Sequence, residues 1–461
     1  MFFRQVLHED LGCASYVIAD GGEAAVIDPK WEIADYLALA DEHGFQITHI
    51  LETHNHADHV SGRGRLQEAT GATIHISEDA GVDYEHEPLA DGDRVEVGEV
   101  RIVALATPGH RPEHLSYIVE DRSRSGEPWL VASGDSLFVG DLARPDLAVE
   151  PKEGARGLFA STRRLLELPD FAEVWPGHIG GSLCGGAGMS EKPLSTIGYE
   201  RRFNRLLAID DEQRFVDELT SGLAPQPPNF TRIVALNRGP LLTQSAQLES
   251  LAPARVQELL AGGATLIDGR ATREFDAVHV PGSINVTMVN AAVGTRAAWV
   301  VDPEADVVVL AASDGDAAEI ARRLEAVGFR SLRGYLAGGI AAWQDAGLDT
   351  DSTPAIDVST LAERLEADDV TLLDVREQDE WAEGHVPGSL HVAYHELRQG
   401  APHELQAARN GTPLAVACSA GNRAAIAVSL LKRHGVGNLI HVTDGGVADL
   451  ADHGIDLVEE G

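Results

Sequence analysis

Short apolar runs separated by glycine-containing turns recur through the first part of the chain. Alternating apolar positions predict strands over residues 15–19 and 24–28, joined by a turn at residues 20–22. Apolar residues at helical spacing predict a helix over residues 31–43, and Gly44 is the residue type that ends a helix in a left-handed conformation. The pattern is typical of a mixed α/β domain.

Four further predicted strands each lead directly into a residue that can bind a metal ion. The strands end near residues 51, 106, 134 and 176, and the residues that follow them are His54, His110, Asp135 and His178. The first of these loops contains three more residues of ligand type, His56, Asp58 and His59. Imidazole and carboxylate groups together suit Zn, Fe or Mn. The sequence therefore predicts a metal site at the strand ends, with room for one or two ions.

The second half of the chain is an internal repeat. Asp268, Arg270 and His279 recur as Asp374, Arg376 and His385, with the offset 374 − 268 = 385 − 279 = 106 residues. Each copy is predicted to open with a helix and to run a strand into Asp-x-Arg, which indicates a duplicated α/β domain of about 100 residues. The proline-rich segment before the repeat predicts a linker, although Phe230 and Ile233 indicate that part of it packs on the first domain.

The two copies differ at one loop. In the second copy Cys418 follows an apolar strand, and a run of small residues leads through Arg423 into an apolar helix over residues 424–431. Backbone N–H groups, a helix N-terminus and Arg423 would together stabilise a thiolate or a persulfide. At the same place the first copy has Ala311 or Ala312 for the cysteine, and Asp316 or Ala317 for the arginine. It is therefore predicted to have lost catalysis.

Composition narrows the choice of partners and compartment. The 461 residues are 44% hydrophobic and carry a net charge of 36 − 73 = −37, which would repel nucleic acid and anionic membranes. The first ten residues turn acidic without a long apolar core, so we expect no secretory signal. The three cysteines, Cys13, Cys184 and Cys418, are too few and too far apart for a disulfide framework. We expect a cytoplasmic protein, with Cys13 serving only for packing.

The ordered motifs His-x-His-x-Asp-His, Thr-Pro-Gly-His, Ser-Gly-Asp and Pro-Gly-His, ending at His59, His110, Asp135 and His178, resemble the metallo-β-lactamase superfamily. The resemblance implies an αββα sandwich with the metal between the loop ends of its two sheets. In two-metal members, the positions that match His54, His56, His110 and Asp135 hold one ion. Those that match Asp58, His59, Asp135 and His178 hold the other.

One subgroup, the persulfide dioxygenases, holds a single iron at the positions that match His54, His110 and Asp135. Residues 140–147 and 178–186 are similar to segments near the iron of that subgroup. The resemblance implies that Cys184 carries or relays sulfur, while a small residue in a glycine-rich loop is the alternative interpretation.

Residues 418–423 resemble the loop of rhodanese sulfurtransferases, and residues 385–389 resemble the upstream signature of that family. The resemblance implies that Cys418 carries sulfane sulfur as a persulfide. The domain order resembles bacterial persulfide dioxygenases fused to sulfurtransferases. We therefore expect an αββα domain and two rhodanese-like α/β domains, over residues 1–246, 247–351 and 352–461.

The fusion implies one Fe(II) per chain, and we expect a homo-oligomer. It also implies a low-molecular-weight thiol persulfide, O₂ and sulfite as reactants, with sulfite from the oxidation converted to thiosulfate. The alternative is a hydroxyacylglutathione hydrolase of glyoxalase II type with two Zn ions. A sensor of sulfide or redox state that uses Cys418 is a third hypothesis.

Overall fold

The computed structural model describes residues 1–8, 10–180, 182–186, 188–288, 292–403, 405 and 412–460. Contacts divide the chain into two units, Met1–Ser245 with Glu325–Gly328, and Ala246–Leu324 with Phe329–Gly461. Across the described ranges, no helix has the length and apolar character needed to cross a membrane.

Two six-stranded sheets form the first unit. The first sheet has the order β1-β2-β3-β4-β5-β6 and the second the order β12-β11-β10-β9-β8-β7. The strands of the first sheet are β1 (Phe2–His8), β2 (Cys13–Asp20), β3 (Glu23–Ile27), β4 (Gln46–Leu51), β5 (Thr73–Ser77) and β6 (Glu87–Leu89). Those of the second are β7 (Arg94–Val97), β8 (Val100–Ala106), β9 (Leu115–Asp121), β10 (Leu130–Gly134), β11 (Glu173–Pro176) and β12 (Ser195–Thr196).

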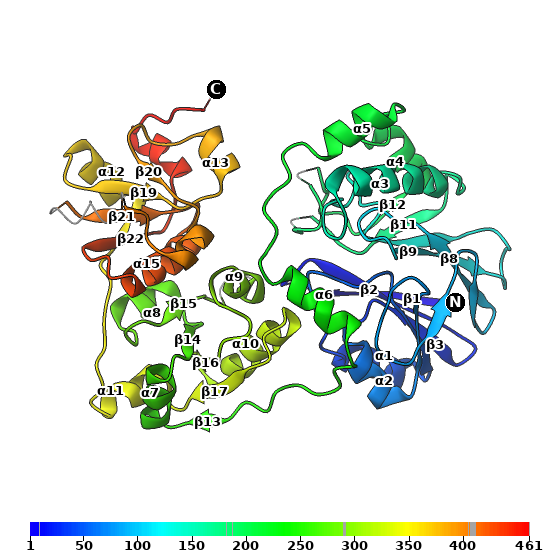
Figure 1. Ribbon diagram of the computed structural model, residues 1–461, viewed down its shortest axis with the longest axis horizontal. Coiled ribbons are helices and arrows are strands. Elements are labelled where there is room, and N and C mark those ends of the chain that lie inside the picture. Colours follow the sequence, from blue (N-terminus) through cyan, green and yellow to red (C-terminus); the bar gives the residue numbers. More distant parts are fainter. Residues whose placement is uncertain are drawn as a thin grey trace. The chain divides into compact units, whose positions relative to one another are not determined.

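Helices cover the outer faces of both sheets, as Figure 1 shows. They are α1 (Ala34–His43), α2 (Arg63–Thr70), α3 (Pro151–Leu165), α4 (Ile197–Phe203) and α5 (Glu212–Leu219). A sixth helix, α6 (Phe230–Arg238), lies against the loop that follows β4. Strand β2 shows why the layers form, because Tyr16 and Ile18 are buried between the sheets and Val17 and Ala19 face the helices. The predicted αββα sandwich is confirmed.

Two details of the first unit differ from the sequence prediction. Helix α1 ends at Gly44 in the left-handed region, as predicted, but begins at Ala34 rather than at residue 31. The proline-rich segment contains helix α6, which the sequence did not predict. Phe230 and Ile233 of α6 are buried, so this part of the segment does pack, as expected.

The second unit contains two five-stranded sheets with the same topology, β13-β17-β16-β14-β15 and β18-β22-β21-β19-β20. The strands of the first copy are β13 (Ser250–Leu251), β14 (Thr265–Asp268), β15 (Ile284–Asn285), β16 (Val307–Leu310) and β17 (Leu332–Leu336). Those of the second are β18 (Ala355–Asp357), β19 (Thr371–Asp374), β20 (Leu390–His391), β21 (Leu414–Ala417) and β22 (Leu439–Thr443). Equal strand order in both sheets confirms the duplication.

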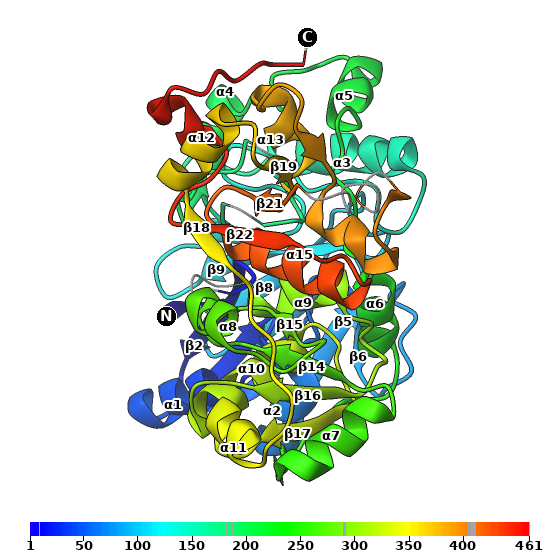
Figure 2. The same ribbon diagram turned by 90° about the vertical axis from the view of Figure 1, so that its left-hand side faces the viewer.

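Helices surround each of these sheets. The first copy has α7 (Pro253–Ala261), α8 (Thr272–Ala277), α9 (Val293–Val300), α10 (Asp314–Ala326) and α11 (Gly339–Asp345). The second has α12 (Val358–Glu366), α13 (Gln378–Glu383), α15 (Asn422–Arg433) and the 3-10 helices η1 (Tyr394–Gln399) and η3 (Ala448–His453). Helix α15 lies alongside β15 of the first copy (Figure 2), so the two copies contact each other within this unit.

Strand register decides which residue of the first copy corresponds to Cys418. Asp268 pairs with Leu310 in the first copy, and Asp374 pairs with Ala417 in the second. The residue after the strand is therefore Ala311 in one copy and Cys418 in the other. The same count places Asp316 at the position of Arg423, so the first copy has an acidic side chain where the second has a basic one.

Candidate functional site

Three side chains of ligand type meet at the ends of β4, β8 and β10 in the first unit. His54, His110 and Asp135 are buried, and Asp135 Oδ2 lies 3.4 Å from His110 Nε2 and 4.0 Å from His54 Nε2. Within the described part of the chain, these three atoms are buried and make no hydrogen bond. Buried polar atoms are almost always paired, so three unpaired ligand atoms that face each other fit a metal ion. The group could therefore hold a metal ion.

Hydrogen bonds fix which nitrogen of His54 can bind the metal. The Thr53 hydroxyl donates to Asp28 Oδ2 at 2.8 Å, so it can only accept from His54 Nδ1, 2.9 Å away. His54 Nδ1 therefore carries the proton and Nε2 keeps its lone pair. Burial also lowers the pKa of His54 well below its ordinary value, which keeps the ring neutral.

His110 is oriented in the same way by a backbone group. Its Nδ1 lies 2.9 Å from the carbonyl oxygen of Arg144, which can only accept, so Nε2 is again the free nitrogen. Burial lowers the pKa of His110 as well. Arg144 belongs to the segment 140–147 that the sequence placed near the metal. Both histidines are therefore held as neutral ligands.

His56, which the sequence offered as a further ligand, is turned toward a different group. Its Nε2 lies 3.1 Å from Asp28 Oδ1 and 3.5 Å from Glu52 Oε2. Burial lowers the pKa of His56, but these carboxylates outweigh that effect and raise it to about 10. A protonated imidazole has no lone pair for a metal. In this arrangement His56 belongs to a buried ion pair.

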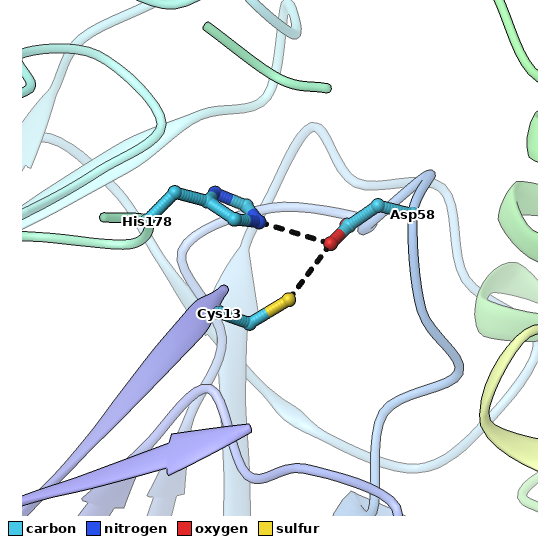
Figure 3. A group of neighbouring side chains, drawn as sticks. All are labelled: Cys13, Asp58 and His178. Atoms are coloured by element: carbon cyan, nitrogen blue, oxygen red, sulfur yellow. Dashed lines mark hydrogen bonds and ion pairs between the residues drawn. The ribbon is translucent and has the colours of Figure 1, made fainter. Parts of the chain in front are cut away.

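Of the other possible ligands, Asp58 and His178 form a cluster with Cys13 (Figure 3), and His59 lies beside Asp58. Asp58 Oδ2 lies 3.0 Å from His178 Nε2 and accepts from Cys13 Sγ at 2.9 Å, and His59 Nδ1 lies 3.2 Å from Asp58. The expectation that Cys13 only packs is wrong, because its thiol donates to a carboxylate.

His178 links this cluster to the triad. Its Nδ1 lies 2.8 Å from Asp135 Oδ1, the oxygen that points away from His54 and His110. Although burial lowers it, the pKa of His178 is raised well above its ordinary value by Asp135 and other acidic groups around the ring. Burial raises the pKa of Asp135, but His178 outweighs burial and lowers it to about 2. A cationic His178 between two carboxylates thus occupies the position of a second metal's ligand.

Cys184 lies beside the same site. Its sulfur is within 4.8 Å of ligand atoms of Asp135 and His178, and its side chain packs against Phe138 and Ala143. Burial raises the pKa of Cys184 well above its ordinary value, which disfavours a thiolate in this conformation. Gly181, in the similar tract before it, lies outside the described residues. Sulfur relay through Cys184 stays a prediction.

Asn237 of α6 holds the metal loop and was missed by the sequence analysis. Its amide nitrogen donates to the carbonyl oxygens of His56 and His59 at 2.9 and 2.8 Å, and its Oδ1 accepts from the Ser61 N–H at 3.0 Å. It lies 178 residues beyond His59 in a proline-rich segment. No local signal could have found it.

The loop of Cys418 connects β21 to α15 in the second unit. The thiol is buried, and the Gly421 N–H donates to its sulfur at 3.1 Å. A Cβ at Gly446 would lie 2.3 Å from the Cys418 carbonyl oxygen, so the second glycine-glycine loop packs directly on the cysteine. This is the backbone bowl that the sequence predicted.

Arg423 does not contact the sulfur directly. Its guanidinium forms a two-point ion pair with Glu380, with one nitrogen 2.7 Å from Glu380 Oε1, and the same nitrogen donates to the Ser419 hydroxyl at 3.0 Å. Glu380 therefore partly neutralises the positive charge of Arg423, which the sequence predicted to stabilise the sulfur. Arg423 orders the loop through Ser419, the residue next to Cys418.

Comparison with known families identifies both halves of the chain. Residues 8–178 match the metallo-beta-lactamase superfamily, and residues 252–346 and 357–453 each match the rhodanese-like domain. The chain therefore joins a domain of the metallo-beta-lactamase superfamily to two rhodanese-like domains that follow it.

Individual proteins and structures that resemble this chain come from both groups of enzymes within the superfamily and from a metallo-beta-lactamase itself. A metallo-beta-lactamase structure from Staphylococcus aureus subsp. aureus COL is 28% identical, with a TM-score of 0.65, and covers 73% of this chain and 98% of its own. The mitochondrial persulfide dioxygenase ETHE1 of Bos taurus is 27% identical over 243 residues, which are 51% of this chain and 87% of that protein.

A hydroxyacylglutathione hydrolase of Rhodospirillum rubrum is more identical over a shorter segment. The identity is 35% over 164 residues, which are 34% of this chain and 57% of that protein. The chain thus spans less than two thirds of the length of this hydrolase. The match to the hydrolase is shorter and more identical, and the match to the dioxygenase is longer and less identical.

The role of Asn237 leads to a first prediction. Asn237→Ala should lower the free energy of unfolding by about 1–3 kcal/mol, because buried backbone groups of the metal loop lose their partners. Metal affinity should fall as well, since the loop carries His54. Thermal unfolding and metal content measured on the same preparations test both effects.

Gln213→Ala on the exposed face of α5 is the matched control, because within the described ranges it removes a side-chain amide that bonds Asp217 and no part of the metal loop. If Asn237→Ala unfolds and binds metal as the Gln213 variant does, Asn237 does not hold the loop.

Proposed function

We propose that the first unit is an Fe(II)-dependent persulfide dioxygenase and that the last domain is a sulfurtransferase acting through Cys418. The observation that carries the proposal is the set of three unpaired ligand atoms, His54 Nε2, His110 Nε2 and Asp135 Oδ2. Two histidines and one carboxylate with open positions are typical of non-haem Fe(II) oxygenases. Fe(II) at these atoms would supply the redox chemistry that reactions of O₂ require.

The proposed chemistry balances over two reactions. A low-molecular-weight thiol persulfide, O₂ and water give the free thiol, sulfite and two protons. Cys418, loaded with sulfane sulfur from a second persulfide, then transfers that sulfur to sulfite, which gives thiosulfate and regenerates the Cys418 thiol. The S–S bond of the Cys418 persulfide breaks as the new S–S bond of thiosulfate forms.

The residues of the chain would contribute orientation and charge to this chemistry. Thr53 and the Arg144 carbonyl keep the free nitrogens of His54 and His110 directed at one point. His178, held between Asp135 and Asp58, would set a positive charge beside an anionic persulfide. At the other site the Gly421 N–H would stabilise the sulfur of Cys418 in its anionic forms.

The alternative is a hydroxyacylglutathione hydrolase with two Zn ions. It is favoured by the similarity to the Rhodospirillum rubrum enzyme and by the grouping of His56, Asp58 and His59. Against it, Asp58 and His178 are hydrogen-bonded to each other, and His56 is paired with Asp28. A sulfur-carrying domain also has no role in thioester hydrolysis.

Three further expectations belong to this proposal. The domains divide at residues 246/247 and 351/352, the protein acts in the cytoplasm, and the chain forms a homo-oligomer.

The metal assignment predicts one Fe per chain in protein purified without O₂, and O₂ uptake with sulfite formation when a thiol persulfide is added. His54→Ala should lose both the metal and O₂ uptake, whereas His56→Gln should keep one metal per chain, because His56 points at Asp28. Elemental analysis and an oxygen electrode measure these quantities. Two Zn per chain, no O₂ uptake and turnover of a glutathione thioester would establish the hydrolase instead.

The sulfurtransferase assignment predicts that Cys418→Ser keeps O₂ uptake but forms no thiosulfate from persulfide and sulfite. The reason is that serine cannot carry sulfane sulfur, while the metal site is left intact. Chromatographic quantification of thiosulfate tests this. Thiosulfate formation that survives in the double variant Cys418→Ser, Cys184→Ser would show that the sulfur carrier has been assigned wrongly.

A further inference from the structure

A buried hydrogen bond joins the two rhodanese-like copies close to the Cys418 loop. Asp276 lies in α8 of the first copy and His441 in β22 of the second, 165 residues further along the chain. Asp276 Oδ2 and His441 Nδ1 are 2.7 Å apart. The side chain of His441 is fully buried and only 5% of that of Asp276 is exposed, so water does not screen the contact.

The other nitrogen of His441 reaches the cysteine loop. His441 Nε2 lies 2.8 Å from the carbonyl oxygen of Gly421, the residue whose N–H donates to Cys418 Sγ. A carbonyl oxygen can only accept, so His441 Nε2 donates to Gly421, and Nδ1 shares the second hydrogen bond with Asp276. The contacts form a continuous path from Asp276 through His441 and Gly421 to the sulfur of Cys418.

Gly421 is a residue whose conformation needs to be held. It immediately precedes α15 with φ of 87°, a left-handed conformation that leaves glycine many alternatives when unrestrained. A Cβ at this position would lie 3.3 Å from the Val442 carbonyl oxygen and 3.6 Å from His441 Nε2. The loop therefore lies directly against β22, and His441 supplies a side-chain hydrogen bond to it there.

Neither copy contains this pair of residues by itself. The offset of 106 residues places Ala382 of α13 at the position of Asp276. Strand register places Tyr335 of the first copy at the position of His441, because Val309 pairs with Tyr335 as Val416 pairs with His441. The hydrogen bond thus exists only between the copies, and it connects the copy without a cysteine to the loop that has one.

We propose that Asp276 is a positioning residue for Cys418, which acts from the first rhodanese-like copy through His441 on Gly421. Fixing Gly421 keeps its N–H directed at the sulfur, so the first copy, although it lacks a nucleophile, contributes to sulfur transfer in the second. The inference rests on the proposed function of Cys418 as the sulfur carrier.

The test compares Asp276→Ala, Asp276→Asn and Arg273→Ala in the full chain. Arg273 is the matched control, because it lies on the same helix and also pairs across to the second copy, with Asp444, but it does not reach Gly421. Two quantities are measured: steady-state sulfur transfer from a thiol persulfide to sulfite, and the rate of alkylation of Cys418 by iodoacetamide, followed on its own peptide by mass spectrometry.

In Asp276→Ala, kcat for sulfur transfer and the alkylation rate should both fall about tenfold, the size expected for the loss of one charge-assisted hydrogen bond. KM for the persulfide should stay within about twofold, since Asp276 does not touch substrate. Asp276→Asn keeps an uncharged acceptor, so both rates should fall only about threefold. Arg273→Ala should have the same kcat and alkylation rate as the unaltered protein.

An alkylation rate at Cys418 that is the same in the Asp276 variants and in Arg273→Ala overturns the inference. If Asp276→Ala does not fold, the comparison of Asp276→Asn with Arg273→Ala decides by the same criterion. The alkylation rate reports on the loop whether or not sulfur is transferred. A failed sulfurtransferase assignment would instead appear as unchanged thiosulfate formation in Cys418→Ser.

Discussion

The hydrogen bond from Thr53 to Asp28 is the constraint on which the metal site depends. Because the hydroxyl proton is committed to Asp28, Thr53 can only accept from His54 Nδ1, and the free nitrogen of His54 is directed at Asp135. The Arg144 carbonyl imposes the same choice on His110. Asp28 also pairs with His56, so one buried carboxylate orients one histidine toward the metal and holds another away from it.

The positions at which a second ion would bind are occupied by hydrogen bonds within the chain. Asp135, His178, Asp58 and Cys13 form an unbroken series in which each side chain bonds the next. A cationic His178 between two carboxylates supplies one positive charge where a second metal would supply two. These hydrogen bonds support the proposal of a single metal per chain.

Sequence patterns placed the candidate ligands next to strand ends but could not give the orientations of their side chains. The strands that precede His54, His110, Asp135 and His178 could be recognised, because period-two alternation and the residues after each strand are local signals. Three other features depend on contacts between distant segments and have no local signal. They are the ion pair of His56 with Asp28 and Glu52, the hydrogen bond from the Cys13 thiol to Asp58, and the hydrogen bonds from Asn237 to the metal loop. Similarly, only strand pairing decided that Ala311 rather than Ala312 corresponds to Cys418.

X-ray absorption spectroscopy at the metal edge of the substrate-free protein tests the one-metal site most directly. We predict one metal per chain, bound by nitrogen and oxygen at about 2.0–2.2 Å, the range of imidazole and carboxylate ligands. Scattering from a second metal about 3.5–4 Å away, the spacing of two-metal sites, would contradict the account. A sulfur ligand at about 2.3 Å would contradict it too, because a thiol, of Cys13 or of Cys184, would then bind the metal.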